Sequence, residues 1–236
     1  MRVYKKILPV FAISAIIAGL SGCSQRINAL NETAKLAFLG SEDVVLSTEQ
    51  VSANPYASIY VKIEDTPQAF VVLAFAEPKT NLSPVKKAPE ALELKWLSAD
   101  KGMLVTVNGR LVKTHNLLTG NLSAVESDEP DPLLLGLHLS NTPRTWTRTL
   151  DWQPGYHYGY KAKSEFKLIA DENILINGSS TQALHFSENV SVEALNIEYQ
   201  NDFWLDPQNG NVLKSRQKIA PNQPFVDITL LKPFAT

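Results

Sequence analysis

Residues 103–114 read MLVTV-NG-RLVKT, and this stretch decides the fold class of the chain. Two short runs rich in apolar and β-branched residues flank Asn108-Gly109. That pair favours a two-residue hairpin turn, because both of its residues tolerate positive φ. The expected cross-strand pairs are Val107 with Arg110, Val105 with Val112, and Met103 with Thr114. These pairs place the apolar side chains of both arms on one side of an antiparallel sheet.

Working outward from this hairpin, the apolar residues keep a period of two along most of the chain, which is typical of strands. Turn residues at 154–155 and 207–210 separate neighbouring runs. Residues 119–144 break the pattern and indicate a long connection, with one helical turn expected from Pro132 and Asp131 as its N-cap. The further strands that we expect are 57–63, 70–76, 92–96, 145–152, 156–169, 174–176, 183–186, 192–200, 203–205, 212–219 and 226–231.

A single segment has a clear helical period. Apolar residues recur at three- and four-residue steps over 27–39, and Gly40 is a natural stop. Strand after strand with so little helix predicts a mainly β fold, either an antiparallel sandwich or a curved half-barrel sheet, with a short N-terminal helix.

The first 23 residues carry a targeting pattern. A basic start is followed by an apolar run over 7–20 and then by Leu20-Ser21-Gly22-Cys23. This pattern predicts a lipoprotein signal peptide over 1–22 and acylation of Cys23, because the run is too short to cross a bilayer comfortably. Two or more fatty chains on Cys23 would give stable membrane anchoring. The chain would then continue as a single mainly β domain over 23–236.

Composition excludes several classes of protein. Removal of the leader takes away three basic residues, and the formal charge falls from −2 to −5, which argues against nucleic-acid binding. Cys23 is the only cysteine, so disulfides and cysteine-rich zinc sites are excluded. The four histidines lie far apart in sequence, and neither a metal ion nor a cofactor is expected.

Several stretches together resemble a known family. They are PYASIYVKI (55–63), QAFVVLAF (68–75), LELKWLSADKGMLVTVNG (92–109), RLVKTHNL (110–117), Asp151-Trp152, NDFWLDPQNGNVLKSRQ (201–217) and LLKP (230–233). Over about residues 30–233 the chain resembles the YjbF family of lipoproteins. The resemblance implies a mostly β lipoprotein of the outer membrane, encoded with exopolysaccharide or capsule secretion components and without an established enzymatic activity. Ser24, directly after the cysteine, agrees with outer-membrane sorting in enteric-type bacteria and implies a domain facing the periplasm or the cell surface.

Two rows of side chains are candidate polymer-binding sites. Lys214, Arg216 and Lys218 would share one side of a strand and could meet an anionic polymer through charge-assisted hydrogen bonds. The same row could instead be a solvated strand face that discourages edge pairing. Tyr156, Tyr158 and Tyr160 would form a second row, which could line a sugar groove or pack a half-wet sheet.

Trp204 and two acids complete the candidates. The Trp204 ring could stack on a sugar or lie in the core. Asp202 and Asp206 could be a glycosidase pair, but four residues along a strand separate them by about 13 Å, and Asp206-Pro207 is typical of a turn.

We therefore expect a non-catalytic lipoprotein that assists secretion or assembly of exopolysaccharide or capsule by binding the polymer or a secretion protein. One alternative is a carrier of lipids or lipoproteins, which would need an apolar concavity. The other is a glycan-modifying hydrolase, which would need two carboxylates at glycosidase spacing in a cleft.

Overall fold

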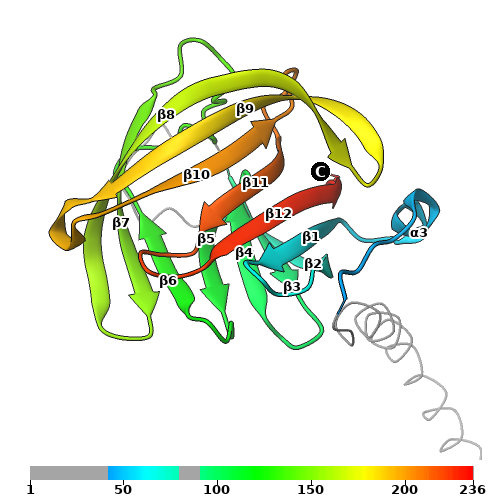
Figure 1. Cartoon of the computed structure of the whole chain (residues 1–236), viewed down its shortest axis with the longest axis horizontal. Coiled ribbons are helices and arrows are strands. Elements are labelled where there is room, and N and C mark those ends of the chain that lie inside the picture. Colours follow the sequence, from blue (N-terminus) through cyan, green and yellow to red (C-terminus); the bar gives the residue numbers. More distant parts are fainter. Residues whose placement is uncertain (1–41, 80–90, 236) are drawn as a thin grey trace, which may run out of the picture.

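The computed structural model describes residues 42–79 and 91–235, which form one twelve-stranded antiparallel sheet and one short α-helix (Figure 1). The elements in chain order are α3 (Thr48–Ala53), β1 (Ser58–Ile63), β2 (Ala69–Pro78), β3 (Leu92–Leu97), β4 (Met103–Val107), β5 (Arg110–His115), β6 (Asn121–Glu126), β7 (Thr145–Gln153), β8 (His157–Ile176), β9 (Ser179–Val192), β10 (Ile197–Leu205), β11 (Val212–Lys218) and β12 (Phe225–Lys232), with a 3-10 turn at Glu193–Leu195. The mainly β prediction is confirmed. Of its two versions, the curved sheet is the one that fits.

The sheet consists of two meanders. Strands β1 to β5 pair in sequence, and so do β6 to β12, while pairing of β1 with β12 joins the two halves. The sheet curls until its edge strands β5 and β6 meet, as Figure 1 shows. The amide of Leu122 donates to the Thr114 hydroxyl across this seam at 2.9 Å. The result is a nearly closed barrel, in which few strand edges are left open.

Gln217 helps to hold the inside of this barrel together. Its buried side chain reaches from β11 to the β4–β5 hairpin, where Oε1 accepts from the Leu111 amide at 3.0 Å and Nε2 donates to the Gly109 carbonyl at 2.8 Å. These bonds satisfy one backbone group of the edge strand β5 and one of the turn before it, as buried backbone groups require.

The core has an aliphatic part and an aromatic part. Inward residues from both halves form the larger cluster, which includes Ile59, Val71, Trp96 and Val190. The aromatic cluster consists of Leu133, Leu137, Trp146, Phe166, Phe186, Phe203 and Leu205. Leu133 and Leu137 come from the connection after β6, so this connection is packed against the sheet interior.

The central hairpin forms with the expected turn but with a different register. Asn108 and Gly109 have φ values of 45° and 80°, and Val107 pairs with Arg110 as predicted. A bulge then shifts the ladder by one residue, so Val105 pairs with Lys113 instead of Val112. Val105, Val107 and Val112 still pack in one cluster, because a bulge adds a residue without reversing the whole face.

Several predicted boundaries are wrong. Residues 121–126 form β6 within the predicted connection. The two strands predicted over 156–169 and 174–176 are one continuous strand, β8, which begins at His157. The predicted strand 192–200 contains the turn between β9 and β10. In the remaining connection, the Asp131 carboxylate accepts from the Leu133 amide at 2.9 Å, and Leu134 and Leu135 bond back to the Asp131 carbonyl. The expected helical turn with its Asp131 cap is present.

The helix that the structure describes is not the predicted one. Segment 27–39 lies outside the described residues, as does Cys23. The observed helix α3 begins at a capping box, in which Ser47 accepts from the Gln50 amide and Gln50 accepts from the Ser47 amide. None of the helices in the described ranges is long and apolar enough to span a membrane.

Candidate functional site

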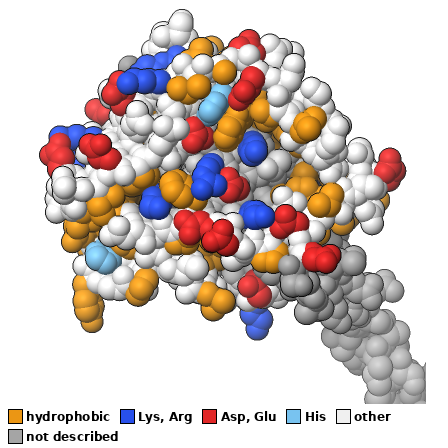
Figure 2. Space-filling view, in the orientation of Figure 1, with side chains coloured by type: hydrophobic (Ala, Val, Ile, Leu, Met, Phe, Trp, Pro, Cys, Tyr) orange, Lys and Arg blue, Asp and Glu red, His pale blue; other side chains and the backbone are white. Residues whose placement is uncertain are grey.

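The predicted basic row lies on the outer face of the barrel. On β11, Lys214, Arg216 and Lys218 point outward, while Ser215 and Gln217 alternate with them and are buried inside. Pairing of β11 with β10 and β12 sets the neighbours of this row. Figure 2 shows several basic side chains near the centre of this face, with acidic ones close by. The row is therefore part of a mixed surface.

Each cation of the row has a different surrounding. Arg216 forms an ion pair with Asp227 of β12 at 3.0 Å, whereas no ion pair joins Lys214 or Lys218 to another described residue. The Lys218 ammonium lies 4.2 Å from the centre of the Phe225 ring. Partial burial lowers the pKa of Lys218, the nearby carboxylate of Glu64 opposes this, and Arg216 acts in the same direction as burial. An anionic ligand at this position would relieve both effects.

Trp204 is neither a core residue nor a free stacking platform. From the strands on either side, His185 stacks on its ring at 4.4 Å between centroids, and the Lys214 ammonium lies 5.2 Å from the ring centre. Its indole N–H donates to Glu172 at 2.8 Å. Because both sides of the ring are occupied, a sugar could stack there only after Lys214 moves. Trp204 instead holds Lys214 in place by a cation–π contact.

The expected row of three tyrosines does not exist. Tyr156 lies in the turn before β8 and is 92% exposed, and Tyr158 is also exposed. Tyr160 packs on Trp152, with ring centroids 4.9 Å apart, next to the aliphatic core. The alternation breaks at Gly159, which has φ of +69° in an irregular part of the β7–β8 ladder.

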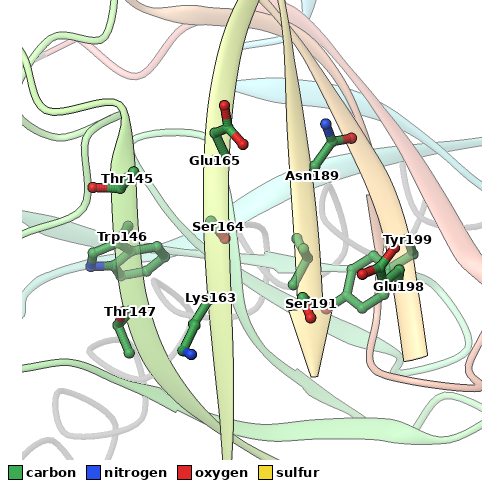
Figure 3. Close-up of a pocket in the computed structure, with 11 residues that line it drawn as sticks. Thr145, Trp146, Thr147, Lys163, Ser164, Glu165, Asn189, Ser191, Glu198 and Tyr199 are labelled. Carbon is green, nitrogen blue, oxygen red and sulfur yellow. The ribbon is translucent and has the colours of Figure 1, made fainter. Parts of the chain in front are cut away.

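A groove crosses the outer face from β7 to β10 (Figure 3). It has a volume of about 710 Å³. Its walls are polar side chains that flank buried residues on each strand: Thr145 and Thr147, Lys163 and Glu165, Asn189 and Ser191, and Glu198; all are exposed except the half-buried Ser191. The backbone of Trp146, Ser164 and Val190 forms the floor, because the side chains of these residues are buried. The groove therefore offers mostly hydroxyl, amide and carboxylate groups.

A buried ionic cluster lies beneath this groove, inside the barrel. Glu188 is fully buried and accepts from Arg110 at 2.6 Å, Arg148 at 3.1 Å, Ser164 at 2.7 Å and Asn201 at 2.7 Å. Asp131, in the connection after β6, pairs with Arg110 at 2.7 Å. Two buried cations thus meet two carboxylates, and their hydrogen bonds are shared among five strands and one loop.

Electrostatics keep the cluster ionised. Burial alone would raise the pKa of Glu188, but attraction by Arg110 and Arg148 outweighs it and lowers the pKa to about 2. Burial opposes the charge of Arg110, and the carboxylates of Asp131 and Glu188 more than offset this, so its pKa is raised. The Arg110 guanidinium also lies 4.9 Å from the centre of Phe203 and 5.1 Å from that of Trp146. A cluster satisfied in this way fixes the floor of the groove.

Sequence reasoning missed both the groove and the cluster. A usable signal was present for the cluster: Glu188 stands between Phe186 and Val190 at strand spacing, and Arg148 stands between Trp146 and Leu150. A charge at an inward position must be paired if the strand is to fold. Which charges pair could not be predicted, because Arg110 lies 78 positions from Glu188.

The proposed carboxylate pair has structural contacts. Asp206 accepts from the Gln208 amide at 2.8 Å and from Asn209 at 2.9 Å, as expected for a turn. Asp202 contacts His185 at 2.9 Å. Within 42–79 and 91–235, no three His, Cys, Asp or Glu side chains gather where they could hold a metal ion.

Two apolar pockets lie at the inner side of the sheet. One has a volume of about 330 Å³, and its walls include Ile59, Leu94, Trp96, Ile228, Leu230 and Phe234. The other is about 230 Å³ in volume, with walls that include Val61, Ile63, Val71 and Leu104. Both have mainly apolar walls, with polar side chains among them, such as Asn108 in the first pocket and Asp100 in the second.

The chain is similar to known proteins over most of its length. The family model for the group 4 capsule polysaccharide lipoprotein GfcB and YjbF matches residues 31–231. The chain belongs to this YjbF family. It is 31% identical over 228 residues to the uncharacterized lipoprotein GfcB of Escherichia coli K12, covering 96% of this chain and 97% of that protein. It is also 31% identical over 223 residues to the uncharacterized lipoprotein YjbF of the same strain, covering 94% and 96%.

A solved structure has the same fold. The crystal structure of the hypothetical lipoprotein YmcC from E. coli K12 superposes with a TM-score of 0.67 at 31% sequence identity, covering 81% of this chain and 91% of that chain. The resemblance drawn from the sequence motifs is thereby confirmed. The family is one of lipoproteins, and its name connects it with capsule polysaccharide.

Proposed function

We propose that this YjbF-family protein binds an acidic polysaccharide and assists its secretion or assembly as capsule or exopolysaccharide, without catalysis. The connection of the family with group 4 capsule polysaccharide supports the class of ligand. The contact surface in this proposal is the outer face of β10 to β12, centred on Lys214, Arg216 and Lys218. Trp204 contributes by positioning Lys214, and not by stacking on a sugar.

The observation that carries the proposal is the state of these three cations. They form a row on one strand of a chain whose formal charge is negative. Lys214 and Lys218 lie against aromatic rings, without an ion-pair partner among the described residues. The pKa of Lys218 is lowered despite the nearby Glu64, so binding of a ligand carboxylate would further stabilise its charged form. A simple solvated strand face would not need cations held in this way.

Anchoring at a membrane is part of the same proposal. The leader pattern and Cys23 support a protein that is acylated and held at the outer membrane, with its domain facing the periplasm or the cell surface. A polymer-binding surface held there could guide a polysaccharide that is being exported. A secretion protein that shares the polymer would be a natural neighbour.

A binding titration tests the proposal. Purified protein without its acyl anchor is titrated with hyaluronate, a polymer in which glucuronate alternates with a neutral sugar, and with neutral dextran. We expect binding of hyaluronate only, weakening as salt rises past about 0.1 M, where screening acts over roughly 10 Å. The variant Lys214→Gln, Arg216→Gln, Lys218→Gln should lose binding. Neutralisation is preferable to charge reversal, because Glu at 216 would face Asp227.

The matched control removes the same charge elsewhere. Lys101, Lys113 and Lys161 are exposed and lie outside both the basic row and the walls of the groove. Their replacement by Gln should leave hyaluronate binding within about twofold of the parent. Equal binding of hyaluronate and dextran, or equal binding by the parent and the Lys214, Arg216, Lys218 variant, would refute the proposal.

One observation favours a second candidate, the lipid carrier. The apolar pocket of about 330 Å³ has the size and lining of a small-molecule site. Uptake of a fluorescent fatty-acid probe tests it. If the pocket binds acyl chains, Ile228→Trp should fill it and abolish the fluorescence gain. A gain that survives this substitution would assign the probe to another surface. The hydrolase alternative gains no comparable support, because Asp202 and Asp206 have local structural contacts.

A further inference from the structure

The groove across β7 to β10 presents hydrogen-bonding groups without protein partners. The side chains of Thr145, Thr147 and Asn189 are exposed and that of Ser191 is half-buried, and none of the four forms a hydrogen bond with another described side chain or backbone group. They project from neighbouring positions of the ladder, since Thr145 pairs with Glu165, and Glu165 with Asn189. The volume of about 710 Å³ lies within the range of small-molecule sites.

The charges of the groove differ from those of the basic row. Lys163 is paired with Glu193 at 2.5 Å, and Glu165 contacts Lys167 at 3.4 Å. Glu198, on β10, adds a carboxylate without an ion-pair partner in the described part of the chain. An acidic sugar would gain little here and would face Glu198. Neutral sugar hydroxyls, in contrast, can donate to carboxylates and exchange hydrogen bonds with amide and hydroxyl side chains.

The groove leads directly to the basic row. Asn189, on its wall, pairs with Gln200 of β10. The adjacent residue Asn201 accepts from the Lys218 amide at 2.8 Å, which joins β10 to the basic strand. One extended polymer could therefore contact both surfaces on the outer face of the same sheet.

The floor beneath the groove is held in one arrangement. Trp146 packs against the Arg110 and Arg148 guanidinium groups, and Ser164 bonds to Glu188. A groove fixed in this way loses little entropy when a ligand binds.

We propose that this groove binds neutral sugar units of the same polymer whose acidic units contact Lys214, Arg216 and Lys218. The ligand class is then an acidic heteropolysaccharide, with neutral and acidic units interspersed along the chain. This inference rests on the proposed function and names the part of the polymer that the basic row does not bind. Thr147, Asn189 and Ser191 are the residues through which it is tested.

The experiment compares short and long hyaluronate oligomers. A short oligomer reaches only the basic row, whereas a long one also enters the groove. The parent should bind the long oligomer at least about tenfold more tightly, since several additional hydrogen bonds form. In Thr147→Ala, Asn189→Ala, Ser191→Ala this gain should disappear, while binding of the short oligomer and its salt dependence stay unchanged. Asn189→Trp, which fills the groove, should remove the same gain.

The control is a matched triple on the projecting end of the β8–β9 hairpin. Asn173→Ala, Ser179→Ala, Ser180→Ala changes exposed residues of similar type and should retain the full gain. If the long oligomer binds no better than the short one, or if both groove variants keep the gain, the inference is overturned and the proposed function stands. If the parent binds neither oligomer, the proposed function fails and the inference fails with it.

Discussion

At the residue scale, Glu188 is the side chain on which the interior depends most. It pairs with two buried arginines, Arg110 and Arg148, and Asn201 and Ser164 complete its hydrogen bonds. Removing one partner of a buried ion pair leaves uncompensated charge, which is more costly than the pair is favourable.

We predict that Glu188→Gln lowers the free energy of unfolding by about 3–5 kcal/mol, because Arg110 and Arg148 lose their shared carboxylate. Urea denaturation at neutral pH measures the change. Glu193→Gln is the control, since Glu193 forms an ion pair with Lys163 on the surface, and exposed pairs contribute little. A similar small effect of both substitutions would show that the cluster does not support the fold.

The same carboxylate predicts a loss of stability in acid. The pKa of Glu188 is about 2 in the folded protein against an ordinary value of 4.5. The stabilisation that Glu188 adds to the free energy of unfolding is therefore present above pH 4.5. It is lost as the pH falls toward 2, where the carboxylate of the folded protein is protonated. The loss amounts to about 3 kcal/mol. Denaturation midpoints measured across this range should fall less steeply in Glu188→Gln; parallel pH profiles would contradict the assignment.

At this scale, the sequence predicts on which side of a strand a side chain lies, but not which residues it contacts. The alternation placed Lys214, Arg216 and Lys218 on one side correctly. It failed at Tyr160, because the irregular ladder at Gly159 turns this ring toward Trp152. It also gave no indication that His185 and Lys214 would flank the Trp204 ring, since the three residues come from three different strands.

At the element scale, the β4–β5 hairpin has two roles. Its Asn-Gly turn sets the local chain direction, and the same turn packs against Val212 of β11 on the opposite side of the interior. A second Asn-Gly turn, Asn177-Gly178 between β8 and β9, has similar φ values but open space around it. Comparing substitutions in the two turns therefore separates the destabilisation caused by backbone strain from that caused by lost packing.

We predict that Gly109→Ala is more destabilising than Gly178→Ala by about 1–3 kcal/mol. Both substitutions force positive φ on a residue with a Cβ, but only at Gly109 would the added Cβ collide with Val212. Thermal or urea unfolding of the two variants gives the comparison. Equal losses would mean that the hairpin does not pack closely against β11.

Most strands could be predicted from apolar alternation, and the hairpin turn from Asn108-Gly109. Strand ends and register could not, because bulges such as the one after Val105 add a residue with no marked sequence signal. β6 was missed since its residues 121–126 lie among Gly, Ser and Pro, and its pairing with β7 depends on a partner more than twenty residues away. The capping box of α3, Ser47 with Gln50, is a sequence signal from which this helix could be predicted.

At the scale of the whole molecule, two meanders joined through β1 and β12 produce an outer face that spans β7 to β12 without a break. The sequence predicted a curved sheet as one of two forms. It could not distinguish this form from a sandwich, because closure depends on the hydrogen bonds of Gln217 with the β4–β5 hairpin and of Leu122 with Thr114, which form only in the folded chain.

Membrane attachment belongs to this scale as well. We predict that Cys23→Ser abolishes acylation, so that the protein remains unprocessed or leaves the membrane fraction. Fractionation with labelled fatty acid measures the effect. Normal processing and membrane association of this variant would contradict the anchor.

The outer face of β7 to β12 as the polymer-binding surface is tested most directly by amide chemical-shift mapping during addition of hyaluronate. The predicted shifts lie on β11 around Lys214, Arg216 and Lys218 and extend to Asn189 and Ser191 with long oligomers. Amides of β3 and β4, on the other side of the barrel, should stay unchanged. Shifts confined to the residues around Ile228 and Phe234, or the absence of shifts on β11, would contradict the account.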